Sequence, residues 1–189
     1  MTNKKLLFVA GLLAASTLTA CNTLKSPHYV GEAETFDADE MSEVSVWTQN
    51  DTAYFVKVVD SNTLIAATLE WDKQKNDFVA RSFPIIISLL EDHMFLNVKD
   101  GDLYTILRIA GTDEEETIVL FTVDLEKMKR DISEGIIKGR IEERTVVMEC
   151  TKEEQDAYIR EHFNSLFAMG GGNLVRRISE EKKRKTNEE

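Results

Sequence analysis

Short β-prone runs divided by turn residues fill the middle of the chain, and their spacing limits the possible folds more than any other feature. The runs at residues 53–59 and 63–71 are separated by Asp-Ser-Asn, and further runs recur up to residue 123. An interval of roughly 8–12 residues between strands is typical of antiparallel meanders, sandwiches and barrels. Asp100-Gly101 stands between two such runs and predicts a tight hairpin, because glycine accepts a positive φ. We therefore expect a mainly antiparallel β meander that forms a small barrel or a sandwich.

Two helices are expected to interrupt this pattern, near residues 124–134 and 151–168, so the predicted fold class is α+β. Asp124 can cap the first helix, and the apolar residues after it recur at helical spacing. Thr151 and Glu154 form a capping box for the second, because each side chain can bond the backbone N–H of the other residue. The last β-prone run, residues 173–178, is expected to close the sheet.

Two positions in the meander leave alternatives open. Pro84 has no backbone N–H to donate, so it predicts either the end of a strand or a strand at a sheet edge. The apolar run at residues 85–90 fits a buried strand or a helical turn.

The first 21 residues carry the pattern of an export signal. Lys4 and Lys5 precede an uncharged apolar run at residues 6–15. This run is shorter than the roughly 20 apolar residues that span a bilayer, and it fits the apolar region of a secretory signal. The tetrapeptide Leu-Thr-Ala-Cys follows at residues 18–21, and it resembles the lipobox of bacterial lipoproteins.

This resemblance implies that Ala20 ends the signal peptide and that Cys21 is the lipidation site. In that family the thiol receives a diacylglycerol, the bond before it is cut, and two or three acyl chains give stable anchoring. Asn22 in place of aspartate implies the outer membrane, facing the periplasm, if the source is Gram-negative. The alternatives are an ordinary cleavable signal with a chance cysteine or an uncleaved helix. The order of elements after residue 43 is also similar to that of small uncharacterised envelope lipoproteins, which implies no activity.

Charge and composition divide the chain further. The formal charge of the 189 residues is −11; removal of residues 1–20 takes two lysines and no acid, which leaves 21 bases against 34 acids and a charge of −13. Such acidity disfavours nucleic acid as a partner. Residues 21–42 are rich in acids and are expected to be a solvated tether. The β-rich domain is expected at 43–178 and a charged, disordered tail at 179–189.

Motifs for catalysis or metal binding are not found in the sequence. The histidines show no metal-ligand spacing, and Cys150 lacks a nucleophile signature, so a buried structural thiol is favoured. No catalytic residue, metal ligand or cofactor is predicted. Five aromatic residues are candidates for an apolar ligand pocket at an open barrel mouth, with ordinary core packing as the favoured alternative. They are Trp47, Tyr54, Trp71, Phe78 and Tyr104.

These patterns together favour a membrane-anchored envelope lipoprotein that is a non-enzymatic binding or interaction module. Its expected partners are the membrane, through the lipid, and an envelope protein or apolar ligand. One alternative is an immunity or inhibitor lipoprotein whose acidic surface blocks a basic toxin or enzyme, since complementary charge speeds association. A second alternative is a cell-envelope hydrolase.

Overall fold

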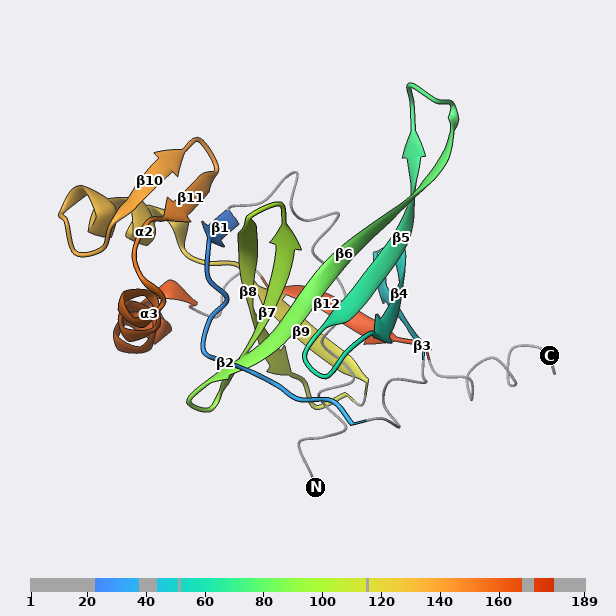
Figure 1. Cartoon of the computed structure of the whole chain (residues 1–189), viewed down its shortest axis with the longest axis horizontal. Coiled ribbons are helices and arrows are strands. Elements are labelled where there is room, and N and C mark those ends of the chain that lie inside the picture. Colours follow the sequence, from blue (N-terminus) through green and yellow to red (C-terminus); the bar gives the residue numbers. More distant parts are fainter. Residues whose placement is uncertain (1–22, 38–43, 51, 115, 168–171, 179–189) are drawn as a thin grey trace.

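The computed structural model describes residues 23–37, 44–50, 52–114, 116–167 and 172–178, and most of them belong to one mainly antiparallel sheet. Eight strands follow one another in the order β8-β7-β6-β5-β4-β3-β12-β9, and pairing of β8 with β9 closes them into a barrel (Figure 1). The strands are β3 (Val44–Gln49), β4 (Thr52–Val58), β5 (Leu64–Asp72), β6 (Asp77–Leu90), β7 (His93–Asp100), β8 (Leu103–Gly111), β9 (Thr117–Phe121) and β12 (Asn173–Arg177). The predicted α+β class with a small antiparallel barrel is confirmed.

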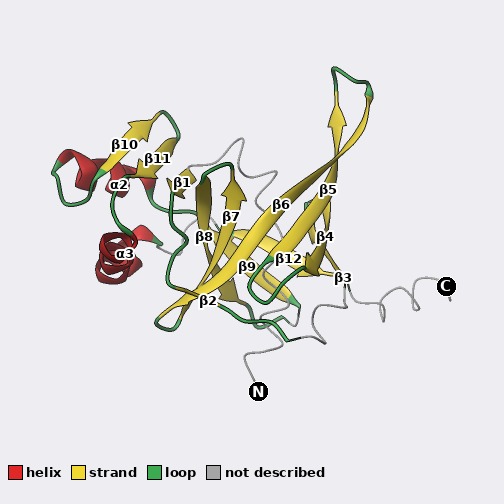
Figure 2. Cartoon of the chain, viewed as in Figure 1, coloured by secondary structure: helices red, strands yellow, loops and turns green. Residues whose placement is uncertain are grey.

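Among the described residues, four further strands and two helices lie outside the barrel. They are β1 (Thr23–Ser26), β2 (Glu32–Ala33), β10 (Gly139–Glu142), β11 (Thr145–Met148), α2 (Leu125–Ser133) and α3 (Lys152–Leu166). In Figure 2 both helices and the β10–β11 hairpin lie together on one side of the barrel. Both predicted caps are confirmed, since Asp124 accepts from the Lys127 amide at 3.0 Å and Thr151 and Glu154 form the capping box.

Alternation of side chains along the strands produces two cores. The inward residues of the barrel strands fill its interior, where Trp47 and Tyr54 are fully buried beside Leu96. The opposite face of β7 and β8 packs against α2, α3 and β11, with Phe95 and Phe163 at the centre. An eight-stranded barrel is just wide enough for side chains to fill it. The barrel interior is therefore a packed core.

The predicted tether at residues 21–42 is wrong for the residues that the structure describes in it. β1 pairs in parallel with β11 and antiparallel with β8, and the chain after it buries Val30 and Phe36. The prediction failed because β1 is only four residues long and its partners lie about 80 to 120 positions away in the chain. The domain thus includes residues from Thr23 on and is not limited to those after residue 43.

The two open alternatives in the meander are also resolved. Residues 85–90 form part of strand β6 and not a helical turn. Pro84 does not end this strand: it pairs with Ile65 of β5, and pairing of β6 with β7 starts only at Ile85. Within the described residues, β6 has a free edge up to Pro84, which is where a residue without an N–H is tolerated.

Candidate functional site

The hairpin of β5 and β6 extends well beyond the barrel wall. Pairing of β5 with β4 ends at Ala67, whereas pairing of β5 with β6 continues to the Asp72–Asp77 pair. In the described chain, residues 68–81 therefore have strand partners only among themselves, and we call this segment the arm. Figure 1 shows it as the long hairpin that projects from the upper right of the barrel. The Asp72 carboxylate accepts from the amides of Gln74 and Lys75, which orders the turn at its tip.

The arm is amphipathic, because residues directly opposite in an antiparallel pair share a face. Leu69 pairs with Ala80 and Trp71 with Phe78, so these four lie on one face. The indole and phenyl rings meet edge to face with centroids 5.1 Å apart. The large apolar side chains of this face are 50–62% exposed, which is unusual for residues that normally fill cores.

The opposite face of the arm is polar apart from Val79, which pairs with Glu70. Arg81 and Glu70 form an ion pair at 2.9 Å across the two strands, and Asp72 and Asp77 follow on the same face. This face continues the inner side of the barrel strands, where Leu64 and Ala66 are buried. Beyond the barrel there is no core for it to cover, so it carries charged residues instead.

The five aromatic candidates for a ligand pocket do not lie together, and the favoured alternative, core packing, describes Trp47 and Tyr54. Trp47 and Tyr54 are core residues, and the indole of Trp47 donates to Ser45 Oγ at 2.9 Å. Trp71 and Phe78 lie outside the barrel, on the arm. Tyr104 lies on the outer side of β8 and contacts Tyr29 edge to face. Leu69, the third large apolar residue of the arm, was not among the candidates, although its alternation with Glu70 and Trp71 is visible in the sequence.

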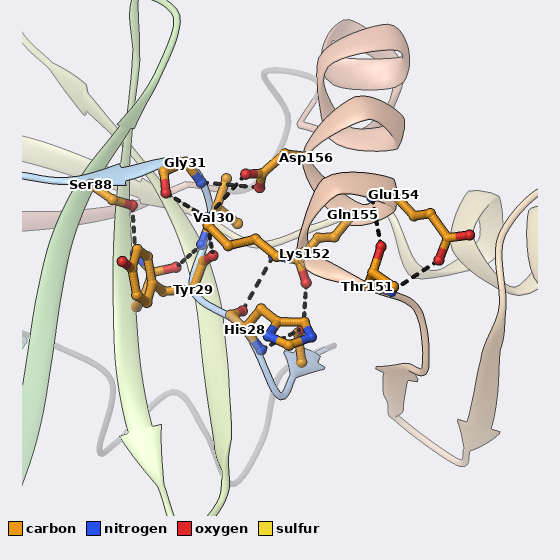
Figure 3. A network of polar contacts seen from close by, with 12 residues as sticks. His28, Tyr29, Val30, Gly31, Ser88, Thr151, Lys152, Glu154, Gln155 and Asp156 are labelled. Carbon is orange, nitrogen blue, oxygen red and sulfur yellow. Dashed lines mark hydrogen bonds and ion pairs between the residues drawn. The ribbon is translucent and has the colours of Figure 1, made fainter.

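A second feature is the strap, residues 27–31, which connects β1 to β2 and lies between the barrel and α3. Figure 3 shows Lys152, in the first turn of α3, donating to the carbonyl oxygens of Tyr29 and Gly31 at 3.1 and 2.5 Å. Asp156, one turn further, accepts from Lys152 and from the Gly31 amide, both at 3.0 Å. The helix thus provides a donor and an acceptor for the strap backbone.

Buried amide side chains hold the strap from both sides. On the barrel side, Asn97 Oδ1 accepts from the Val30 amide at 3.0 Å, and its Nδ2 donates to Ser88 Oγ at 2.8 Å. On the helix side, Gln155 bonds Ser26 Oγ and donates to the His28 carbonyl. Asn97 and Gln155 are fully buried. Buried polar groups in folded proteins nearly always have hydrogen-bond partners, so these bonds fix the strap in one position.

One cavity, of about 400 Å³, lies between α3 and the segment after α2. Lys138, Cys150, Glu154, Tyr158 and His162 are among its lining residues. Burial and the Glu154 carboxylate raise the pKa of the Cys150 thiol. Because the thiolate is the reactive form, this environment suits a structural thiol and not a nucleophile.

A carboxylate beside this cavity is held by two donors. Tyr158 donates to Asp131 at 2.5 Å and Lys127 bonds the same oxygen at 2.6 Å. Burial works to raise the pKa of Asp131, but the bonds from Lys127 and Tyr158 hold it below its ordinary value. Burial and the neighbouring carboxylate raise the pKa of Tyr158 far above its ordinary range. The group joins α2 to α3 and is structural in character.

A second cavity, of about 340 Å³, lies where β6 turns into β7, and Arg108 and His93 are among its lining residues. The guanidinium lies over the rings of Phe121 and Phe163 and donates to the Phe167 carbonyl at 3.3 Å. His93 stacks on Phe163 with centroids 3.5 Å apart. Burial lowers the pKa of Arg108. Its cation packs between aromatic rings and caps the end of α3.

Cys21 and Ala20, the predicted lipidation and cleavage residues, lie outside the described residues. Of the helices in the described ranges, neither has the length and apolar character to span a bilayer. Within the same ranges, no three of the His, Cys, Asp and Glu side chains converge as a metal site. Comparisons with protein-family models, with curated proteins and with solved structures give no match.

Proposed function

We propose that this chain is a lipid-anchored lipoprotein of the bacterial cell envelope, and that its barrel domain is a non-enzymatic binding module. The lipobox-like order of residues 1–21 supports the anchor. The observation that carries the binding role is the arm, where Leu69, Trp71 and Phe78 expose their side chains to solvent. Exposed apolar patches on small proteins mark sites of interaction.

The packed interior of the barrel supports binding on the outer surface. Trp47 and Tyr54 occupy the position that a ligand would take in a hollow barrel, and both are fully buried. An apolar ligand inside would have to displace them. The arm needs no such rearrangement, because its apolar face is already open.

The lipid anchor is testable through the two cysteines of the chain. Cells that express the protein are supplied with a palmitate analogue suitable for covalent tagging. We expect label on the wild type and on Cys150→Ala, and none on Cys21→Ala, which also leaves the membrane fraction. Label that persists in Cys21→Ala, or that is missing from the wild type, would refute the lipoprotein assignment.

A second candidate, an inhibitor or immunity lipoprotein, is favoured by charge. The exported chain would carry −13, and opposite charge speeds association with a basic toxin or enzyme. A pull-down from envelope extract at low and moderate salt tests it. Retention of a basic protein that salt releases supports this candidate, and retention of none contradicts it.

A further inference from the structure

The position of Cys21 limits where the membrane can lie relative to the domain, and this argument rests on the proposed lipid anchor. Two residues of extended chain reach at most about 7 Å, so the lipid would be held close to Thr23. The Thr23 amide donates to the Arg144 carbonyl at 2.9 Å, in the turn between β10 and β11. A lipid on Cys21 therefore places the β10–β11 turn beside the headgroups.

The strap prevents the domain from swinging freely about this point. β1 is paired on both sides, and the chain that follows is bonded to Asn97, Lys152, Gln155 and Asp156. The proposed anchor thus joins directly to a rigid part of the fold. A protein held this way presents one side to the membrane.

The arm points toward that same side. The register of β6 with β7 places the β7–β8 turn at the end of the barrel from which the arm extends, since Ile85 pairs with Val98 and residues 77–84 continue beyond. In Figure 1 the β10–β11 turn, the β7–β8 turn and the tip of the arm all lie on the upper side of the molecule. A membrane surface that contacts the β10–β11 turn would therefore also lie close to the tip of the arm.

The chemistry of the arm suits the boundary between headgroups and acyl chains. Tryptophan is enriched at this depth because its ring is apolar and its N–H is polar. The arm also has three acids and three bases, so it is neutral in a chain of net charge −11. Lys73 and Lys75 lie at its tip, where anionic headgroups would meet them. The unpaired edges of the arm require water or headgroups as partners, which excludes the hydrocarbon core.

We infer that the arm is a second membrane contact, which inserts Trp71 and Phe78 into the bilayer interface while the lipid at Cys21 holds the domain in place. The partner is the lipid surface itself. The apolar face of the arm is removed from water on insertion, and the lysines of its turn face the headgroups.

The two tryptophans of the chain provide the test, because Trp47 is enclosed in the barrel and Trp71 is half exposed. The full-length lipidated protein is reconstituted in vesicles of phosphatidylcholine and phosphatidylglycerol, with or without bromine on the acyl chains. Bromine quenches only a tryptophan at the membrane, so we expect Trp71 emission to fall about two-fold or more. Trp71→Phe reports Trp47 alone and should show no quenching.

A second pair of variants tests the chemistry of the contact. Leu69→Ser with Phe78→Ser removes apolar area from an exposed face and should abolish most of the quenching. Lys73→Glu with Lys75→Glu should reduce it in anionic vesicles and leave it nearly unchanged in neutral ones.

The outcomes separate this inference from the proposed function. Wild-type protein that floats with the vesicles through Cys21 but shows no bromine quenching overturns the inference and leaves the anchor intact. Protein that fails to float overturns the anchor. Protection of Trp71 from acrylamide without bromine quenching also overturns the inference, because it indicates a protein contact, such as a second copy.

Discussion

Lys152 donates to the carbonyl oxygen of Gly31 at 2.5 Å, and this bond joins the first turn of α3 to a backbone segment 121 residues earlier in the chain. The same ammonium group bonds Tyr29 and Asp156 and lies 4.5 Å from the centroid of the Tyr29 ring. Together with Gln155 and Asp156, this side chain attaches the strap to the helix layer.

Replacement of this lysine should loosen the strap. Lys152→Met keeps the aliphatic chain and removes the charged donor, and we expect a loss of about 1–2 kcal/mol, since the site is partly exposed to solvent. Urea unfolding measures the loss, and limited proteolysis should show faster cleavage in residues 27–31. Lys129→Met, which removes an exposed pair with Glu126, is the matched control and should change little. Equal effects of the two variants would contradict the role of Lys152.

Gly31 and Gly101 allow the cost of a strained φ to be measured separately from the cost of a steric clash. Both have positive φ, +64° and +60°, but a Cβ on Gly31 would lie 2.0 Å from the Leu89 carbonyl oxygen, and one on Gly101 meets nothing within 4 Å. Gly101→Ala should cost about 1–2 kcal/mol, the ordinary penalty of the left-handed region. Gly31→Ala should cost clearly more, because the strap must also move away from β6. Similar unfolding free energies for the two variants would refute this.

The pair of Tyr158 and Asp131 predicts a pH dependence of stability. The pKa of Asp131 is lower in the folded than in the unfolded protein, so its contribution is present above the unfolded pKa and is lost as the pH falls through the folded pKa. Tyr158→Phe removes one of the bonds that lower this pKa and should cost about 1.5–3 kcal/mol at neutral pH.

Unfolding free energies between neutral and acidic pH measure this effect. In Tyr158→Phe, the loss of stability on acidification should be smaller than in the wild type and should end at a higher pH, because it starts at the unfolded pKa in both proteins and the folded pKa of Asp131 is lowered less. Tyr104→Phe, on the outer side of β8, is the control and should follow the wild-type curve. An unchanged acid profile in Tyr158→Phe would exclude the bond as its source.

The two tryptophans should differ sharply in their contribution to stability. Trp47→Ala removes a fully buried ring from the barrel interior and should cost about 3–5 kcal/mol. Trp71→Ala changes a half-exposed residue on the arm and should stay within about 0.5 kcal/mol. Denaturant curves followed by circular dichroism compare them. A large cost at Trp71 would mean that the arm is part of the folding core and not a free surface.

Local features were predicted correctly from the sequence because their physics is local. The alternation along β4 and β5, the hairpin at Gly101 and the caps at Asp124 and Thr151 each depend on residues within a few positions of one another. These features were sufficient for the α+β class and the antiparallel meander.

The features that only the tertiary structure decided depend on strand pairs that are far apart in the chain. Closure by β12 between β3 and β9 selects the barrel, and the pairing of β1 with β8 and β11 turns an expected tether into part of the fold. The positions of Trp47 and Trp71 differ for the same reason. Both stand in amphipathic strands, but Trp47 lies on the face that lines the barrel interior and Trp71 lies on the face that continues its outer side. Alternation says which residues share a face, and only the neighbouring strands decide whether that face is buried.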